Sequence, residues 1–168
     1  AKQYCAVDLI MGKQKEVKIG RGAVPNRYKT MSPELMTTIT EYTKTGGNVM
    51  LTGSFIATDI WDKKNAVEEE KAFAADVLGY KWRVGQAAIV GKIHSVPSIH
   101  SKLSDDGSWT FGMELNDKIY AVESPDAIYP ADTQTGATVF RYTENNIPAG
   151  VASSKNGYKT FVLGVPFE

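Results

Sequence analysis

Ser54 is the residue of this sequence whose position best suits covalent chemistry. It follows the short apolar stretch "NVMLTG" and precedes "FIATD". In α/β proteins a nucleophile often lies at the end of such a strand, where a base activates it and backbone N–H groups stabilise the oxyanion. A tight nucleophile turn needs small residues after the serine, however, and here Phe55 and Ile56 follow. We therefore expect Ser54 to be a structural turn residue, with a serine nucleophile as the alternative.

The two histidines, His94 and His100, are the only imidazole bases available to such a serine. If the segment "KIHSVPSIHS" is extended, they stand roughly 20 Å apart at about 3.3 Å per residue and cannot share a metal ion. Pro97 argues against one continuous central strand, although a bend there would bring the two rings closer. We expect both to be surface or strand-end residues. Cys5 is the only cysteine, which excludes an internal disulfide and a multi-cysteine metal site.

Two carboxylates and an indole follow Ser54 and form a candidate binding site. Asp59, Trp61 and Asp62 come just after the strand end, where α/β folds usually place ligands. An aromatic ring beside carboxylates suits a sugar. Trp61 can equally pack beneath the next helix, and packing is the role we favour for it.

The segment "GKQKEVKIGRG" concentrates positive charge near the N-terminus. It lacks the Gly-Lys-Ser/Thr ending of a phosphate loop and does not open into a helix, so it is not a phosphate cradle. Its cations could contact an acidic saccharide, although a solvated loop is the simpler interpretation; they are Lys13, Lys15, Lys18 and Arg21. Together with the residues after Ser54 they give the candidate substrate-binding set, which is Asp59, Trp61, Lys13 and Arg21.

An α/β framework is needed to position these candidates, and the first half of the sequence predicts one. Residues 32–46 predict a helix with Ser32 as its N-cap, apolar residues spaced by three and four, and Gly46 at its end. Residues 48–53 follow as a short buried strand, and residues 65–78 predict a second helix. A helix, a glycine stop and a buried strand in succession are typical of a mostly parallel sheet.

After Gly79 the sequence changes to short β-like runs separated by turn signals such as "DDG", "ENN" and "KNG". The C-terminal half is therefore expected to be β-rich and antiparallel. Its last apolar run, 158–164, is expected to lie beside 48–53 in the sheet. Asp126, in the proline-rich "ESPDAIYPAD", is expected to be a turn residue.

Length and charge narrow the classes of function. A chain of 168 residues suits a single domain, and its N-terminus begins almost directly with a strand-like run, as a fragment of a longer chain would. Lys plus Arg and Asp plus Glu are both 19, and this zero net charge argues against nucleic acid as the main partner. No apolar run approaches the roughly 20 residues of a membrane span.

The order "SPELMTTITEYTKTGGNVMLTGS" followed by "FAADVLGY" resembles the class I glutamine amidotransferase-like fold. The likeness is greatest to accessory domains of secreted carbohydrate-active enzymes, such as the trimerisation domain of some β-galactosidases. "VDLIMGKQK", "GYKWRVGQA" and "YAVESPDAIYPAD" resemble bacterial xanthan lyase-like proteins. The resemblance implies one flavodoxin-like, amidotransferase-like α/β domain over 1–168, with a layered sheet and a β-rich C-terminal half, in a secreted, periplasmic or cell-surface protein.

The resemblance also bears on catalysis. In that family a cysteine nucleophile follows the strand that matches "NVMLTG", which places Ser54 or a neighbour at the corresponding position. The family's His-x-Glu pair comes from the last strand, but "VLGVPFE" offers Glu168 without a histidine.

We therefore expect a non-catalytic accessory module that aids assembly or engages glycan, without cofactor or metal. The expected partners are other domains of the same parent protein, with acidic polysaccharide as a candidate ligand. The alternatives are a hydrolase that uses Ser54 and a part of a polysaccharide lyase, for which the sequence offers no identifiable base.

Overall fold

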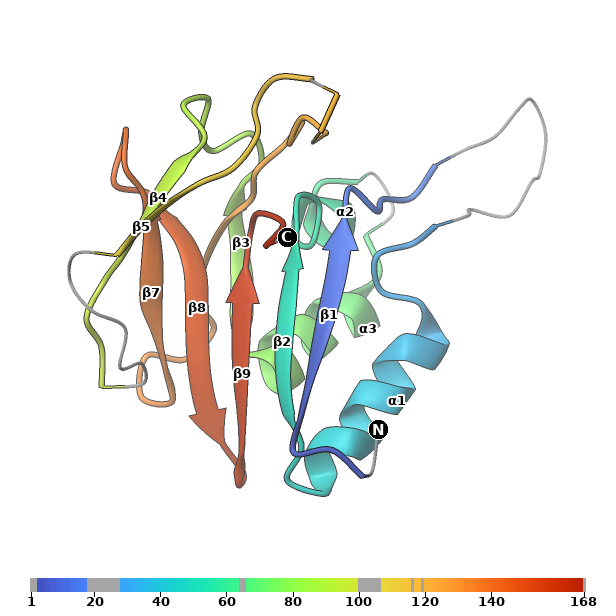
Figure 1. Ribbon diagram of the computed structural model, residues 1–168. Helices are drawn as coiled ribbons and strands as arrows, with labels where there is room; N and C mark the ends of the chain where they lie inside the picture. Colours follow the sequence, from blue (N-terminus) through green and yellow to red (C-terminus); the bar gives the residue numbers. More distant parts are fainter. Residues whose placement is uncertain are drawn as a thin grey trace.

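A seven-stranded mixed sheet forms the centre of the molecule (Figure 1). The computed structural model describes residues 3–17, 28–63, 66–99, 107–115, 117–118 and 120–167. In spatial order the strands of the sheet are β1 (Ala6–Gly12), β2 (Asn48–Gly53), β9 (Tyr158–Leu163), β8 (Pro148–Lys155), β7 (Gly136–Tyr142), β4 (Lys92–Ser95) and β5 (Ser108–Thr110). The first three strands are parallel, and every later pairing in the sheet is antiparallel.

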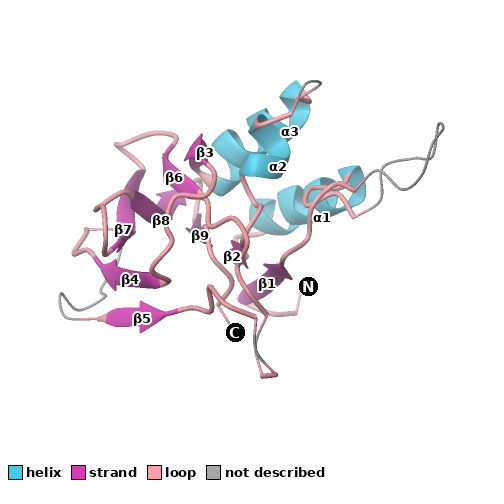
Figure 2. Ribbon diagram, turned by 90° about the horizontal axis from the view of Figure 1, so that it is seen from above, coloured by secondary structure: helices cyan, strands magenta, loops and turns pink. Residues whose placement is uncertain are grey.

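The helices all lie on one side of the parallel part of this sheet (Figure 2). They are α1 (Pro33–Lys44), the single turn α2 (Thr58–Trp61) and α3 (Glu68–Phe73), which continues as a π-helical turn over Ala74–Leu78. Beside them a two-stranded ribbon of β3 (Tyr80–Val84) and β6 (Ala127–Pro130) lies against β8. The helices and the ribbon therefore form one layer and the large sheet forms the other.

Two buried clusters stabilise these layers. The first lies between the helices and the parallel strands and includes Ile39, Leu51, Ile60, Leu78 and Val162. The second lies among the antiparallel strands and includes Ile93, Val139, Phe140, Ala149 and Leu163. Burial of this much apolar surface is the dominant favourable term in folding.

The signals for the first helix and strand act as the sequence predicts. The Ser32 hydroxyl accepts a hydrogen bond from Leu35 N at 3.2 Å, which caps α1. Gly46 has a φ of +83°, and a side chain at Gly47 would collide with the ring of Tyr42. The tight turn between α1 and β2 therefore depends on this glycine pair.

The predicted pairing of 48–53 with 158–164 is confirmed, because β2 and β9 are parallel neighbours with Val49 opposite Thr160. The predicted antiparallel character of the C-terminal half is confirmed as well. The predicted helix 65–78 begins only at Glu68 and ends in the π-helical turn.

The expected fold class, a flavodoxin-like or amidotransferase-like layered α/β fold, is wrong. The structure is 36% strand and 19% helix, so strands dominate, and its sheet is curled and mixed. Short connections join β7 to β8 and β8 to β9, and such turns leave no chain for the crossover helices that a parallel sheet requires. Within the described residues, helices cover only one face of β1, β2 and β9.

The one-sided packing of β2 leads to a prediction. Leu51 is fully buried in the helix-side cluster, whereas Met50 points to the opposite face and is half-buried. Leu51→Ala is expected to lower the free energy of unfolding by about 2–5 kcal/mol, and Met50→Ala by roughly half of that or less. Urea unfolding of the two variants measures this difference, and equal losses would contradict packing on one face.

Candidate functional site

A polar cleft lies where β1 and β2 end, at the edge of the sheet to which both parallel strands deliver their carboxyl ends. It consists of two adjoining hollows of about 320 and 440 Å³, which share Lys15, Phe55, Thr58 and Asp62. The larger hollow adds the end of β3 and the loop before β6, with Trp82, Gln86, Glu123 and Ser124. Ligands of α/β proteins usually bind at this edge.

Lysines of the loop after β1 cross to one carboxylate on the far wall of the cleft. Lys13 Nζ lies 2.6 Å from Glu123 Oε1, and Lys15 Nζ lies 3.3 Å from Glu123 Oε2. The hydrogen bond from Lys13 holds the pKa of Glu123 below its ordinary value. Lys15 Nζ also lies 4.3 Å from the centre of the Phe55 ring, within the range of a cation–π contact. Glu123 is exposed and the two lysines are partly exposed, so the ion pairs are weak and open to exchange with a charged ligand.

A second set of charges fixes the floor of the smaller hollow. Glu70 of α3 is buried and pairs with both Lys29 and Lys63, and Lys63 reaches on to Glu16 at 3.1 Å. Burial acts to lower the pKa of Lys63, but its hydrogen bonds to Glu70 and Glu16 outweigh that effect and raise it. Both carboxylates of this set, Glu70 and Glu16, are paired with lysines, so these ion pairs form a structural network.

Asp59 lines the smaller hollow, but both of its carboxylate oxygens are occupied. Oδ1 accepts a hydrogen bond from Glu16 N at 2.8 Å, and Oδ2 accepts one from Thr30 N at 3.0 Å. The candidate ligand-binding residue Asp59 therefore joins the two ends of the loop that follows β1.

The aromatic wall of the cleft is formed by a tryptophan that sequence reasoning missed. Trp61 packs at the edge of the helix-side core, with its ring centre 5.8 Å from that of Tyr80. Trp82 lines the larger hollow instead, and its indole Nε1 is buried without a hydrogen-bond partner among the residues that the structure describes. Only the alternation of apolar and charged residues in "YKWRV" gave a signal that Trp82 faces inward. Arg21 and Lys18 fall outside the described residues.

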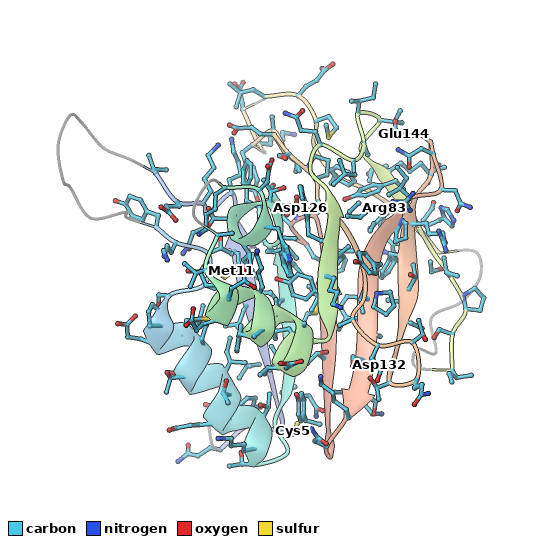
Figure 3. All side chains as sticks on the ribbon, turned by 180° about the vertical axis from the view of Figure 1, so that it is seen from behind. Cys5, Met11, Arg83, Asp126, Asp132 and Glu144 are labelled. Carbon is cyan, nitrogen blue, oxygen red and sulfur yellow. The ribbon has the colours of Figure 1, made fainter. Side chains whose placement is uncertain are left out.

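Asp126, labelled in Figure 3, is fully buried and is hydrogen-bonded to Thr58, which lines the cleft. Its Oδ2 accepts hydrogen bonds from Ala57 N at 2.7 Å and Thr58 N at 2.8 Å, while Oδ1 is hydrogen-bonded to the Thr58 hydroxyl. The carboxylate thus caps α2, which has no side-chain cap of its own. Burial raises the pKa of Asp126 to about 7, despite these three hydrogen bonds. The sequence predicted a turn residue here, but Asp126 does not lie in a turn; it immediately precedes β6.

Ser54 has no catalytic neighbours in the described part of the chain. It is fully buried, its N–H donates to Gly12 O at 2.9 Å, and its hydroxyl has no hydrogen-bond partner there. His94 lies on β4, four strand spacings or about 19 Å from β2 along the sheet, with its Nδ1 3.5 Å from the Thr143 hydroxyl. His100 and Glu168 fall outside the described residues.

The described residues contain no cluster of three or more His, Cys, Asp or Glu side chains that could hold a metal ion. None of the helices in the described ranges is long and apolar enough to cross a membrane. No protein-family model matches the chain, and no curated protein matches it in sequence.

The buried Ser54 hydroxyl leads to a prediction about reactivity. A fluorophosphonate probe should give no adduct by intact mass, because the hydroxyl is inaccessible and no base contacts it. Ser54→Ala should leave the free energy of unfolding unchanged or raise it slightly, since the substitution removes a polar group that is buried without a partner. An adduct that is absent from Ser54→Ala would contradict this and restore the nucleophile.

Asp126 leads to a prediction about pH. Its folded-state pKa of about 7 exceeds the ordinary value of 3.8, so between these values the folded protein binds the extra proton. Stability should therefore fall by a few kcal/mol as the pH rises from about 4 to about 7. Asp126→Asn should remove that slope, because the amide oxygen can still accept from both N–H groups while the group no longer titrates.

Chemical denaturation between pH 4 and pH 8 would measure this slope. Asp132→Asn is the matched control, because Asp132 is an exposed carboxylate that accepts a hydrogen bond from Gln134 N at a surface turn. The control should keep the slope of the unmodified protein. A slope that survives in Asp126→Asn would assign the pH dependence to other groups.

Proposed function

We propose that the chain is a non-catalytic accessory module of a secreted carbohydrate-active protein of the xanthan lyase-like kind. Its cleft at the ends of β1 and β2 engages acidic saccharide. The observation that supports this most directly is the combination, in one hollow, of aromatic rings with a lysine, carboxylates and an amide.

The chemistry of the cleft suits a charged sugar. The half-buried ring of Trp82 lines the larger hollow and offers apolar area to the C–H face of a pyranose, whereas Phe55, which is 8% exposed, adds little to it. Gln86 and Asp62 can exchange hydrogen bonds with hydroxyl groups. Lys15 can move from the exposed Glu123 to a uronate carboxylate at little cost, because its present ion pair is weak.

The absence of an activated nucleophile supports a binding role over a hydrolytic one. Ser54 is sealed from solvent, and no hydrogen bond among the described residues links it to a base. A polysaccharide lyase would need a base and a group that neutralises the uronate carboxylate. The cleft offers Lys15 for neutralisation, but each of its carboxylates already accepts hydrogen bonds or lies exposed at the rim.

Titration with uronate-containing oligosaccharides tests the proposal, with neutral oligosaccharides of equal length as the comparison. Binding is expected to be weak, to favour the acidic series and to fall with added salt. Lys15→Gln should weaken binding of the acidic series by up to about fivefold and flatten its salt dependence, since one ion pair contributes up to about 1 kcal/mol near a surface.

Lys92→Gln, at an exposed lysine of β4, is the matched control and should bind as the unmodified protein does. Trp61→Ala should act through stability, because that ring packs against the core. Equal binding by Lys15→Gln and Lys92→Gln would remove the cleft as the site. Binding that is lost in a folded Trp61→Ala variant would restore the site first predicted from the sequence.

A further inference from the structure

β1 is an edge strand with an open outer side in the part of the chain that the structure describes. It stands first in the sheet, and β2 is its only hydrogen-bonded strand there (Figure 1). Alternate N–H and C=O groups of an edge strand point away from the sheet. β1 therefore presents a row of backbone donors and acceptors to any strand that approaches it.

The sequence of β1 lacks the features that usually prevent such pairing. Its seven residues, AVDLIMG, contain no lysine, arginine or proline, and Asp8 is the single charge. Ile10 is 51% exposed, and Ala6 is exposed as well. Most small domains protect an apolar edge of this length, because it templates association with another strand.

The open surface is wider than the strand itself. On the face without helices, β1 borders a hollow of about 420 Å³ whose apolar lining includes Met50, Ala152 and Phe161. On the helix-side face, Val7, Leu9 and Met11 are half-buried at the rim of the core. Both faces next to the edge thus keep apolar area that a further strand would cover.

We infer that β1 pairs antiparallel with β1 of a second copy of this chain, about a two-fold axis at Leu9. The two sheets then form one continuous sheet across the dimer. In this register Asp8 lies opposite Ile10 of the partner subunit, and Val7 lies opposite the partner's Met11. All seven residues of β1 take part, and the two half-buried rims cover each other.

Self-complementarity is the reason for choosing a second copy as the occupant. With a two-fold axis perpendicular to the sheet, each residue of β1 lies opposite a residue of the partner strand that points to the same face. The axis can therefore pass through a residue, but not midway between two residues. A shift that centres the axis on Asp8 would set it against the partner's Asp8, and like charges directly opposite are destabilising. The register at Leu9 both avoids that contact and gives the longest overlap. The zero net charge of the chain adds no long-range repulsion between copies.

Charge substitutions at Ile10 test this register by sedimentation equilibrium. Ile10→Asp places two carboxylates opposite each other twice in the dimer and should raise the dimer dissociation constant at least about tenfold. Ile10→Lys, the matched variant at the same half-exposed position, faces the partner's Asp8 and should dimerise as well as the unmodified chain or better. The double variant Asp8→Lys with Ile10→Asp reverses the pair and should recover dimerisation.

A monomeric unmodified protein at the highest soluble concentration would overturn the inference, and so would equal loss in the Asp and Lys variants. The inference is independent of the saccharide site, because β1 pairing and the cleft use different residues. Titration of Ile10→Asp with the same oligosaccharides should give unchanged affinity. Loss of saccharide binding alone would count against the cleft, and loss of the dimer alone would count against β1.

Discussion

The Asp126 carboxylate is the point at which the two halves of this molecule are joined. Its side chain holds the backbone at Ala57 and Thr58 after β2, while its main chain is fixed to the other half. Its N–H donates to Gly164 O beyond β9, and its carbonyl accepts from the Tyr142 hydroxyl of β7. A side chain at Gly164 would collide with that carbonyl, so the chains meet without space between them.

The cleft is a consequence of this junction. Because the turn after β2 is drawn toward Asp126, Phe55 and Thr58 become its floor, and the end of β3 closes one side. Tyr80 reinforces the same turn by donating its hydroxyl to Ile56 O at 2.7 Å. Burial of a carboxylate costs free energy, and the hydrogen bonds that Asp126 accepts from Ala57 and Thr58 offset part of that cost. These hydrogen bonds hold the turn after β2 in one position, and this turn forms part of the wall of the cleft.

The sequence predicted the parts of this architecture whose signals are local. Ser32 caps the first helix, Gly46 ends it, and the apolar run after it is a buried strand, all within a short stretch of chain. Pairings between distant segments decided the rest. The antiparallel strands extend the parallel sheet, rather than forming a separate layer, because β8 pairs with β9. The N–H groups that bind the Asp126 carboxylate lie 68 and 69 residues away in the sequence, so no local pattern predicts this contact. The alternation in "YKWRV" indicates that Trp82 faces inward, but no local pattern tells that Trp82, rather than Trp61, lines the cleft.

The two hydrogen bonds that Asp59 accepts, from Glu16 N and Thr30 N, bear on how much the length of the loop after β1 can vary. The Asp59 side chain holds the backbone at Glu16 and at Thr30, so both ends of the loop are fixed in place by a residue outside it. Doubling the length of a closed loop costs only about 0.6 kcal/mol in entropy. A change in the length of the segment between those two residues should therefore cost little stability, provided that Lys29, which pairs with the buried Glu70, is kept.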